Sequence, residues 1–398
     1  MATRHRSCPA DGAVVVSSGV SRREFVSRTA LASAAVLVGR DAVAQTGPSS
    51  VAPKAAPSTG RGGSLHPQQN QFRNLLDVSG LWQFQLDPKE EGESQRWFDA
   101  LPAPRMIAVP CSWNDLFDDA RDYLGLAWYR REVYVPSAWR GQRIFLRIGS
   151  ANYAAKVWVN GKVVATHLGG HLPFAADISS EVAWGRPNVI AITVENKQLP
   201  DRVPPGPAGA GAGVFGTMAP YPATTYDFFP YAGLHRPVLL CALPAAAHID
   251  DITVTTTIEG GDGVVAVQVL TGGPYAGAGA LQLNGTETAL QFRDGAAAAM
   301  VRLPAARLWS PQDPHLYPLT VMLGSGKNVT DSYALDIGIR TVAVRGDQLL
   351  LNGQPIKLKG FGKHEDFPIH GRGQDLPMWI RDHELLRWVG ANSYRTSH

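Results

Sequence analysis

The side chains with the most versatile chemistry gather in the last stretch of the chain, 351–398. Lys363-His364-Glu365-Asp366 form a polar loop, and Arg395 and His398 belong to the final run NSYRTSH. A histidine can hydrogen-bond a hydroxyl through one ring nitrogen while a neighbour holds the other. An arginine can bind a carboxylate through two parallel N–H groups. These side chains can share a site only if the fold brings the two runs together.

The pattern between the two runs predicts how they meet. A short run at 356–360 leads into Gly360-Phe361-Gly362 as one strand, and 392–397 favours a second strand. Asp375 to Val389 is predicted to be helical, because apolar residues recur on one face and Gly390 suits the left-handed position after a helix end. Such a βα unit has parallel strands and a right-handed crossover. His364 and His398 would then follow adjacent strands, at the edge that carries the chemistry of a (β/α)₈ barrel.

The two C-terminal runs resemble glycoside hydrolase family 2, and within it the β-glucuronidases. The runs are GFGKHED at 360–366 and NSYRTSH at 392–398. The family signature normally continues with Tyr-Pro, which we expect to follow His398 in the complete protein. Other runs similar to the family are WYRR, VWVNG, GGHLPFAAD and DFFPYAGLHR, the last with Pro230 where asparagine is usual. The resemblance extends from about Leu75 to His398.

The resemblance implies four substrate-binding residues. His364 would contact the substrate at the floor of a sugar pocket, His398 would also line it, and Arg395 would orient carboxylates nearby. Asp177 would reach from the sugar-binding domain and accept hydrogen bonds from sugar hydroxyls. The alternative for His364 is an ordinary polar loop residue. The alternative for Asp177 is a turn or cap residue ahead of Ile178-Ser179-Ser180.

Catalysis would require residues outside this stretch. Retaining glycoside hydrolysis uses two carboxyl groups about 5–5.5 Å apart, and in the resembled family both are glutamates on later barrel strands. We therefore expect no catalytic residue in this chain, and no activity from the chain alone. Glu365 and Asp366 are adjacent carboxylates, but neighbouring loop residues rarely face one reacting atom together.

Two β-sandwiches are predicted ahead of the βα unit. Alternating apolar residues and the Asn160-Gly161 turn predict an antiparallel jelly roll at 71–245, which resembles the family's sugar-binding domain. Short strands across 246–340 favour an immunoglobulin-like sandwich. The expected protein is mostly β, with 341–398 as the first βαβ of a TIM barrel. Three tryptophans at alternating strand positions are expected in the core rather than as sugar platforms: Trp113, Trp128 and Trp158.

The N-terminal segment predicts export. Arg22-Arg23 precedes an apolar run from Thr29 to Val38, and Ala42-Val43-Ala44 follows. This order is typical of a bacterial twin-arginine signal peptide, here 1–44, and the apolar run is shorter than the ~20 residues that a membrane span needs. The alternative is a chance basic, amphipathic start. A Ser/Pro/Gly-rich linker is expected at 45–70, and the mature protein is expected in the periplasm or outside the cell, with no membrane partner after cleavage.

Composition limits the remaining options. The 398 residues carry a net charge of only +3, and six arginines in the first forty positions account for much of the positive excess, so no nucleic-acid partner is inferred. No three-ligand zinc spacing or nucleotide-binding fingerprint occurs, and no metal or cofactor is expected. Cys111 and Cys241 are expected to be buried thiols, although a disulfide between them stays open. A homo-oligomer is one option for the assembly.

We therefore expect the N-terminal part of an exported β-glucuronidase that acts on a carbohydrate, a glucuronide. One alternative is another specificity of the same family, a β-galactosidase or β-mannosidase. A second alternative is of another class, a non-catalytic carbohydrate-binding β-sandwich protein.

Overall fold

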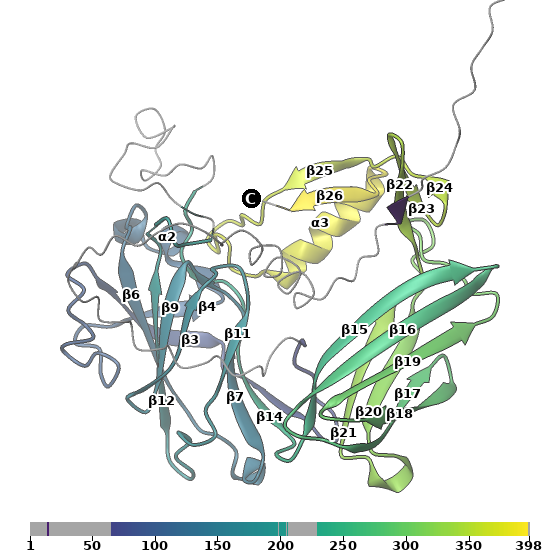
Figure 1. Cartoon of the computed structure of the whole chain (residues 1–398). Coiled ribbons are helices and arrows are strands. Elements are labelled where there is room, and N and C mark those ends of the chain that lie inside the picture. The colour runs from purple at the N-terminus through teal and green to yellow at the C-terminus, as the bar shows by residue number, and fades with distance from the viewer. Residues whose placement is uncertain (1–13, 16–64, 198, 204, 206–228, 397–398) are drawn as a thin grey trace, which may run out of the picture.

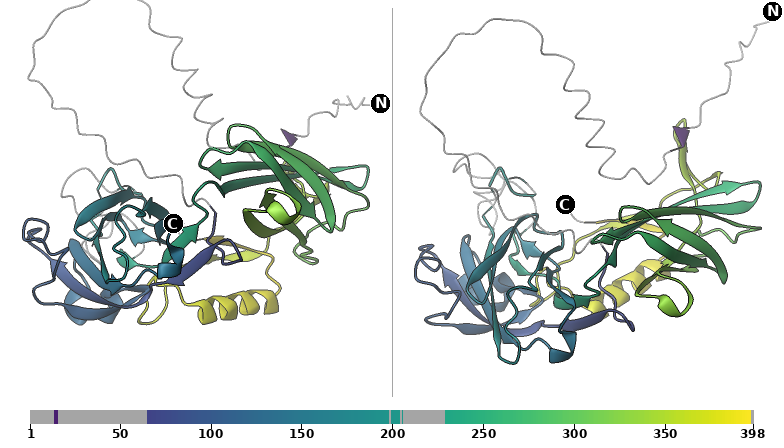
Figure 2. Two further views of the ribbon diagram at one scale, coloured as in Figure 1. Left: turned by 90° about the horizontal axis from the view of Figure 1, so that it is seen from below. Right: turned by 60° about the horizontal axis from the view of Figure 1, so that its bottom comes forward.

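The computed structural model describes residues 14–15, 65–197, 199–203, 205 and 229–396, and these form three parts (Figure 1). Two β-sandwiches lie side by side, and the C-terminal part lies across the junction between them (Figures 1 and 2). Most of the predicted leader and linker falls outside the described residues, as does His398.

The first sandwich packs a six-stranded sheet against a four-stranded one, and every strand pair is antiparallel. The larger sheet has the order β10 (Lys162–Leu168), β9 (Ala154–Val159), β12 (Asn188–Glu195), β6 (Leu126–Val133), β3 (Gly80–Asp87) and β4 (Arg105–Val109). The smaller has the order β11 (Phe174–Asp177), β7 (Arg143–Ile148), β14 (Val238–Leu243) and β2 (Asn74–Asp77). The mostly β jelly roll expected from the alternating pattern is confirmed.

The hairpin between β9 and β10 forms where the Asn-Gly pair predicts it. Asn160 and Gly161 have φ angles of 51° and 79°, and Lys162 pairs with Val159. Two successive positive φ angles are the mark of a type I′ turn, whose twist matches that of the flanking strands. The same residue pair at Asn352-Gly353 closes the hairpin between β23 (Gln348–Leu351) and β24 (Gln354–Pro355) with φ angles of 53° and 76°.

Both faces of the larger sheet are covered, and this explains its buried tryptophans. One face packs on the smaller sheet around Trp82, Phe84 and Trp113. Trp128 and Trp158 point to the other face, where Trp97, Phe98 and Leu101 cover them. The rings of Trp128 and Trp158 contact each other at a tilt of 31°, with centroids 4.9 Å apart. The prediction that Trp113, Trp128 and Trp158 belong to the core is confirmed, since each is at most 2% exposed.

A small three-stranded sheet forms the edge of the jelly roll that faces the C-terminal part. Its order is β5 (Cys111–Ser112), β13 (Gly233–Leu234) and β8 (Ala151–Asn152). The short helix α2 (Trp113–Leu116) follows β5 directly. Three 3₁₀ turns complete the sandwiches: η1 (Asp118–Ala120), η2 (Ser137–Trp139) and η3 (Gly326–Asn328).

The second sandwich has its own apolar core, built from the facing sides of two sheets. One sheet is β15 (His248–Glu259), β16 (Asp262–Gly272) and β19 (Ala296–Leu303). The other is β18 (Thr286–Phe292), β17 (Gly277–Leu283), β20 (Tyr317–Leu323) and β21 (Asp331–Ile337). This is the predicted immunoglobulin-like sandwich.

A buried ion pair joins the two sandwiches. Arg73, just ahead of β2, donates to Asp331 of β21 over 2.6 and 2.8 Å, and their side chains are 4% and 0% exposed. The same guanidinium donates to the carbonyl of Ile249, and the Ile249 N–H donates to the Asp331 carboxylate. A buried charge pair is stable only when such further hydrogen bonds satisfy it, as they do here.

The C-terminal part begins with hairpins and ends in the predicted parallel unit. The strands β22 (Val342–Arg345), β23 (Gln348–Leu351) and β24 (Gln354–Pro355) form one sheet with the two-residue β1 (Val14–Val15). Then β25 (Gly360–Lys363), α3 (Leu376–Trp388) and β26 (Ser393–Thr396) follow, and β25 pairs with β26 in parallel.

The helix and the parallel pairing confirm the pattern read from the sequence. The Asp375 carboxylate accepts the N–H of Met378 at 3.1 Å as the N-cap, and Gly390 has a φ of 76° just past the helix end. One boundary was wrong: the strand begins at Gly360 instead of 356, because the N–H of Ile356 bonds back to Leu349. No residue of α3 is buried, and Trp388 is 83% exposed.

The two cysteines among the described residues are buried thiols, as expected from the sequence. Cys111 and Cys241 form no disulfide, and burial raises the pKa of each thiol to about 11.

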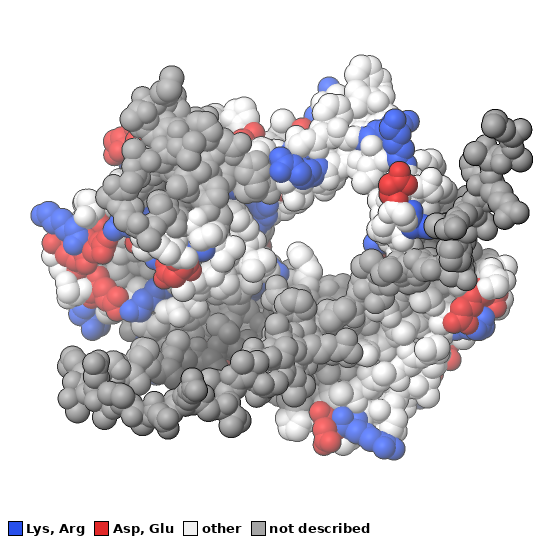
Figure 3. Space-filling view, turned by 45° about the horizontal axis from the view of Figure 1, so that its top comes forward, with Lys and Arg blue, Asp and Glu red and all other residues white. Residues whose placement is uncertain are grey.

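Within the described residues, no helix has the length and apolar character to cross a bilayer, and no group of three His, Cys, Asp or Glu side chains is arranged to bind a metal. On the face shown in Figure 3, basic side chains are interspersed with acidic ones.

Candidate functional site at the junction of jelly roll and barrel

Two of the predicted site residues lie at the strand pair. His364 directly follows β25, and Arg395 lies in β26 opposite Gly362. A Cβ at Gly362 would be 3.7 Å from Nη2 of Arg395, so the guanidinium lies against this glycine. His398 is two residues beyond β26 and outside the described residues.

The two faces of the strand pair differ. Lys363 and Tyr394 face α3: the ammonium of Lys363 is 3.0 Å from Asp382, and the Tyr394 ring meets His383 edge-on at 5.4 Å. Since side chains alternate along a strand, Arg395 points to the opposite face from Tyr394. In a complete barrel the helices cover the outside, so Arg395 is on the side that would become the interior.

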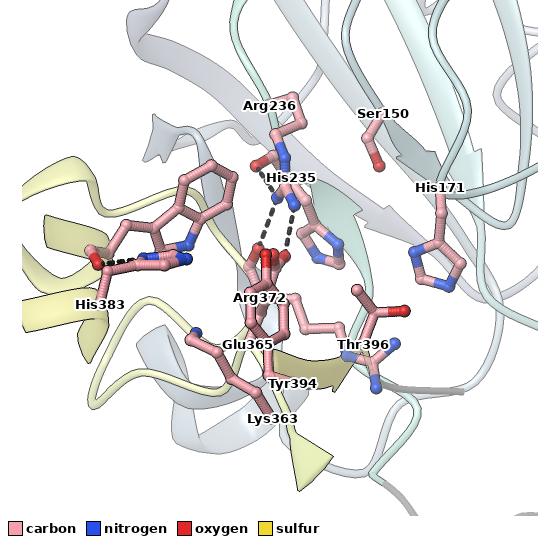
Figure 4. A pocket seen from close by; sticks show the side chains of 11 residues that line it. Ser150, His171, His235, Arg236, Lys363, Glu365, Arg372, His383, Tyr394 and Thr396 are labelled. Atoms are coloured by element: carbon pink, nitrogen blue, oxygen red, sulfur yellow. Dashed lines mark hydrogen bonds and ion pairs between the residues drawn. The ribbon is translucent and has the colours of Figure 1, made fainter. Parts of the chain in front are cut away.

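A cavity of about 350 Å³ lies between the jelly roll and the βαβ unit (Figure 4). The jelly roll lines it with Ser150, His171, His235 and Arg236. The C-terminal part lines it with Lys363, Glu365, Arg372, Trp379, His383, Tyr394 and Thr396. Its lining includes the α3-facing residues of the strand pair, so the cavity lies on the outer face. His364 and Arg395 are not among its lining residues.

Arg236 connects several elements of the junction. Its guanidinium pairs with the carboxylate of Glu365 and donates to the carbonyls of His235 at 3.0 Å and Arg372 at 3.2 Å. It also lies over the ring of Trp379, 5.1 Å from the centroid. One side chain of the jelly roll therefore contacts the loop after β25 at two points and the helix α3 at a third (Figure 4).

Backbone contacts hold the second half of the same loop. The N–H of Ser112 donates to His370 O and the N–H of Gln374 donates to His235 O, both at 2.9 Å. The hydroxyl oxygen of Ser112 accepts the N–H of Arg372 at 3.0 Å. These bonds fix the loop to β5 and to the residue after β13, so part of the barrel's backbone lies on the jelly roll.

Two of the three histidines that line the cavity, His171 and His235, favour their neutral forms. Burial lowers the pKa of His235 well below its usual value, and the nearby His171, Arg372 and Arg236 lower it further. Burial and the same two arginines lower the pKa of His171 to about 4. His171 has an exposed surface, so water weakens the effect there, whereas His235 is only 1% exposed. Neutral rings can both donate and accept hydrogen bonds at this junction.

Ser112 and His235 have the residue types of a nucleophile and its base, with Oγ and Nε2 2.8 Å apart. Ser112 is 0% exposed, and its Oγ already accepts the Arg372 N–H. A nucleophile must be reachable by a substrate. The pair is therefore structural.

His364 borders a second hollow, of about 360 Å³, between β25 and α3. Its Nδ1 lies 3.6 Å from the Asp366 carboxylate, which is also 3.5 Å from Nε of Arg372. The neighbours of His364 on its C-terminal side thus face two arginines: Glu365 pairs with Arg236, and Asp366 lies near Arg372. With both carboxylates engaged, Glu365 and Asp366 do not form a catalytic pair.

The structure does not bring Asp177 to this junction. Arg143 donates to the carboxylate over 2.5 and 3.1 Å, and Ser179 donates through its N–H and its hydroxyl. Burial pushes the pKa of Asp177 up, but the bonds from Ser179 and Arg143 outweigh it and leave the pKa below its usual value. Asp177 is also about 10 Å further along β11 than Phe174, on the side away from His171. These contacts are those of the turn alternative.

Sequence reasoning missed Arg236 and Glu365 as partners. Arg236 was visible at the end of the family-like run DFFPYAGLHR, and Glu365 was considered only as a catalytic carboxylate. The two residues are 129 positions apart, and no local pattern links residues at that distance. The signal available was a charged residue in each of two predicted domains, the jelly roll and the start of the barrel.

Each of the three parts of the chain matches a model of a known protein family. Residues 75–244 match the model described as "Glycosyl hydrolases family 2, sugar binding domain", 247–340 match "Glycosyl hydrolases family 2", and 342–398 match "Glycosyl hydrolases family 2, TIM barrel domain". Between residue 75 and His398 only short gaps are left.

Known relatives are similar over the same length. A β-glucuronidase of Paenibacillus borealis is 40% identical over 356 residues, which are 84% of this chain and 56% of the relative. The mouse β-glucuronidase is 40% identical over 365 residues, 85% of this chain and 55% of the relative. The chain thus spans little more than half the length of these relatives.

Solved structures show the same likeness. The crystal structure of Ruminococcus gnavus β-glucuronidase superposes with a TM-score of 0.77 at 37% identity, over 85% of this chain and 57% of that one. The same enzyme in complex with D-glucuronic acid gives a TM-score of 0.76 at 36% identity, over 86% and 58%.

Proposed function

The chain belongs to glycoside hydrolase family 2, and from that premise we propose that the complete protein hydrolyses β-D-glucuronosides with retention of configuration. The observation that carries the proposal is the ~40% identity to β-glucuronidases across both sandwiches and the start of the barrel. The superposition with an enzyme solved with D-glucuronic acid supports the same substrate class.

The described part would bind and position rather than cleave. A retaining enzyme needs an acid/base and a nucleophile about 5–5.5 Å apart, and in the described residues both carboxylates beside His364 are engaged by arginines. We propose that later barrel strands supply the two glutamates. His364, Arg395 and His398 would then contact the substrate at the C-terminal edge of the first two barrel strands, where TIM-barrel enzymes place their sites.

The test compares two lengths of the protein. The gene is read beyond the codon for His398, where a Tyr-Pro continuation and two later glutamates are expected. The protein extended over the whole barrel is then assayed for release of an aryl alcohol from aryl β-glucuronide, β-galactoside and β-mannoside. Turnover of the glucuronide alone supports the proposal, whereas preference for either other sugar selects the other family specificities.

The 398-residue chain is the matched control in this assay. We expect no turnover above a heat-killed sample, because each catalytic carboxyl contributes orders of magnitude, about 10²–10⁴-fold for the acid alone. If the extended protein binds glucuronides without cleaving them, the non-catalytic carbohydrate-binding alternative holds. Light scattering on the extended protein decides between a monomer and a homo-oligomer.

We also propose that the protein is exported through the twin-arginine route. The support is the sequence from Arg22-Arg23 to Ala42-Val43-Ala44. That route carries folded proteins, which suits two buried, unpaired cysteines that need no oxidising compartment.

A further inference from the structure

We infer that Arg236 of the jelly roll is a positioning residue for the substrate-binding edge of the barrel: through Glu365 it sets the conformation of the loop that carries His364. The inference rests on the proposed function for its kinetic consequence. Its structural part concerns the 398-residue chain alone.

The loop after β25 is held unevenly. Residues 370–374 are fixed to Ser112 and His235 by the hydrogen bonds described above, and Phe367 and Gly371 close a tight turn with mutual N–H···O bonds of 2.8 and 2.9 Å. A Cβ at Gly373 would lie 2.7 Å from Cα of Cys111, so the second half of the loop lies directly on the jelly roll. It has little freedom to shift.

The first half, 364–366, depends on side-chain contacts. Glu365 is anchored to Arg236, and both side chains are partly exposed, at 36% and 27%. The Asp366 carboxylate lies near Arg372, whose backbone carbonyl in turn accepts a hydrogen bond from Arg236. Arg236 therefore binds Glu365 directly and also binds Arg372, the residue that lies near Asp366. His364 directly precedes Glu365 and Asp366 in the chain. The positions of these two residues therefore constrain the backbone of His364.

The geometry of Arg236 requires a guanidinium. Nη1 donates to two carbonyl oxygens, Nη2 donates to the carboxylate, and the guanidinium carbon lies over the ring of Trp379. A lysine ammonium could reach Glu365 but lacks the planar fork and the stacking face. Because a displacement of about 1 Å at a reacting group can cost roughly 100-fold in rate, a small change in this loop has a measurable effect.

The first experiment is hydrogen–deuterium exchange on the 398-residue chain. Arg236→Ala should raise exchange in the peptide that covers 364–367 while peptides of the immunoglobulin-like sandwich stay unchanged. The matched control is Arg302→Ala, which removes an arginine paired with Glu259 and Asp262 in that sandwich. Unchanged exchange at 364–367 in folded Arg236→Ala protein would overturn the inference. If Arg236→Ala does not fold, Arg236→Lys is measured against the same criterion.

The second experiment is a double-mutant cycle in the complete enzyme with an aryl β-glucuronide. We expect Arg236→Ala to lower kcat/KM by about 10- to 100-fold, Arg236→Lys to recover part of it, and Arg236→Ala to have little further effect in a His364→Ala background. Additive effects would show that Arg236 does not act through His364, because independent sites add. A wild-type enzyme without turnover refutes the proposed function, and the exchange experiment still decides the structural claim.

Discussion

Ser112 of the jelly roll and Gly371 of the barrel's first loop approach so closely that a Cβ at Gly371 would be 2.5 Å from the Ser112 hydroxyl oxygen. Ser112 is fully buried, and Gly371 has a φ of 54°. The absence of a side chain at 371 therefore allows the barrel backbone to dock on the small sheet of the jelly roll.

Gly371→Ala should loosen the junction. Alanine at a positive φ costs about 1–2 kcal/mol by itself, and overpacking against buried Ser112 adds about 1–3 kcal/mol. The matched control is Gly346→Ala, with a φ of 60° and no atom within 4 Å of the added Cβ, which isolates the backbone cost. Urea unfolding followed by tryptophan fluorescence gives the free energy of unfolding of each variant. Equal losses in the two variants would contradict the steric explanation.

Arg73→Met should destabilise the contact between the sandwiches strongly. It leaves the Asp331 carboxylate buried without its counter-charge, for which the usual cost is about 3–5 kcal/mol. Arg302→Ala, which breaks exposed pairs, should cost no more than about 1 kcal/mol. Thermal unfolding of the two variants beside the wild type measures the difference, and a similar small loss in both would show that Asp331 finds water or another partner.

Stability should fall as the pH drops below about 6.5, partly because of His235. Its folded pKa is well below the usual value, so between the two values the unfolded chain binds a proton that the folded chain does not. The contribution of neutral His235 is therefore complete above pH ~6.5 and is lost progressively towards acid. His235→Gln should show a weaker loss of unfolding free energy between about pH 7.5 and about pH 5, on either side of the usual histidine pKa of ~6.5. Parallel pH profiles for variant and wild type would assign the loss to other groups.

Asp177→Asn distinguishes the two roles considered for this residue. The carboxylate accepts from Arg143 and Ser179, so we expect a stability loss of about 1 kcal/mol, reduced by its partial exposure. KM of the complete enzyme for an aryl β-glucuronide should stay unchanged. A raised KM with unchanged stability would return Asp177 to the sugar pocket.

Export should depend on the paired arginines. Replacing Arg22 and Arg23 by lysine keeps the charge but removes the recognised pair, and the precursor should accumulate in the cytoplasm. Cell fractionation with immunoblotting measures the distribution. The same replacement at Arg4 and Arg6, basic residues outside the pair, is the control and should leave export intact. Undiminished periplasmic protein from the first variant would remove the twin-arginine route.

Local signals in the sequence were enough for the elements and their order. The Asn160-Gly161 turn and the glycine at 390 act within a few residues, and the structure has both where the pattern predicts them. The parallel pairing of β25 with β26 also follows from local signals. A strand, a helix and a second strand of these lengths form a right-handed crossover between parallel strands.

The tertiary structure alone decided which charged groups are engaged. Asp177 and Glu365 have the same chemistry in the sequence as any free carboxylate, and their arginine partners lie 34 and 129 positions away. It also decided which residues cover Trp128 and Trp158, namely Trp97, Phe98 and Leu101. Pairing and burial of this kind depend on which surfaces meet after folding. Because long-range contacts are set by the packing of whole sheets, no short pattern of residues encodes them.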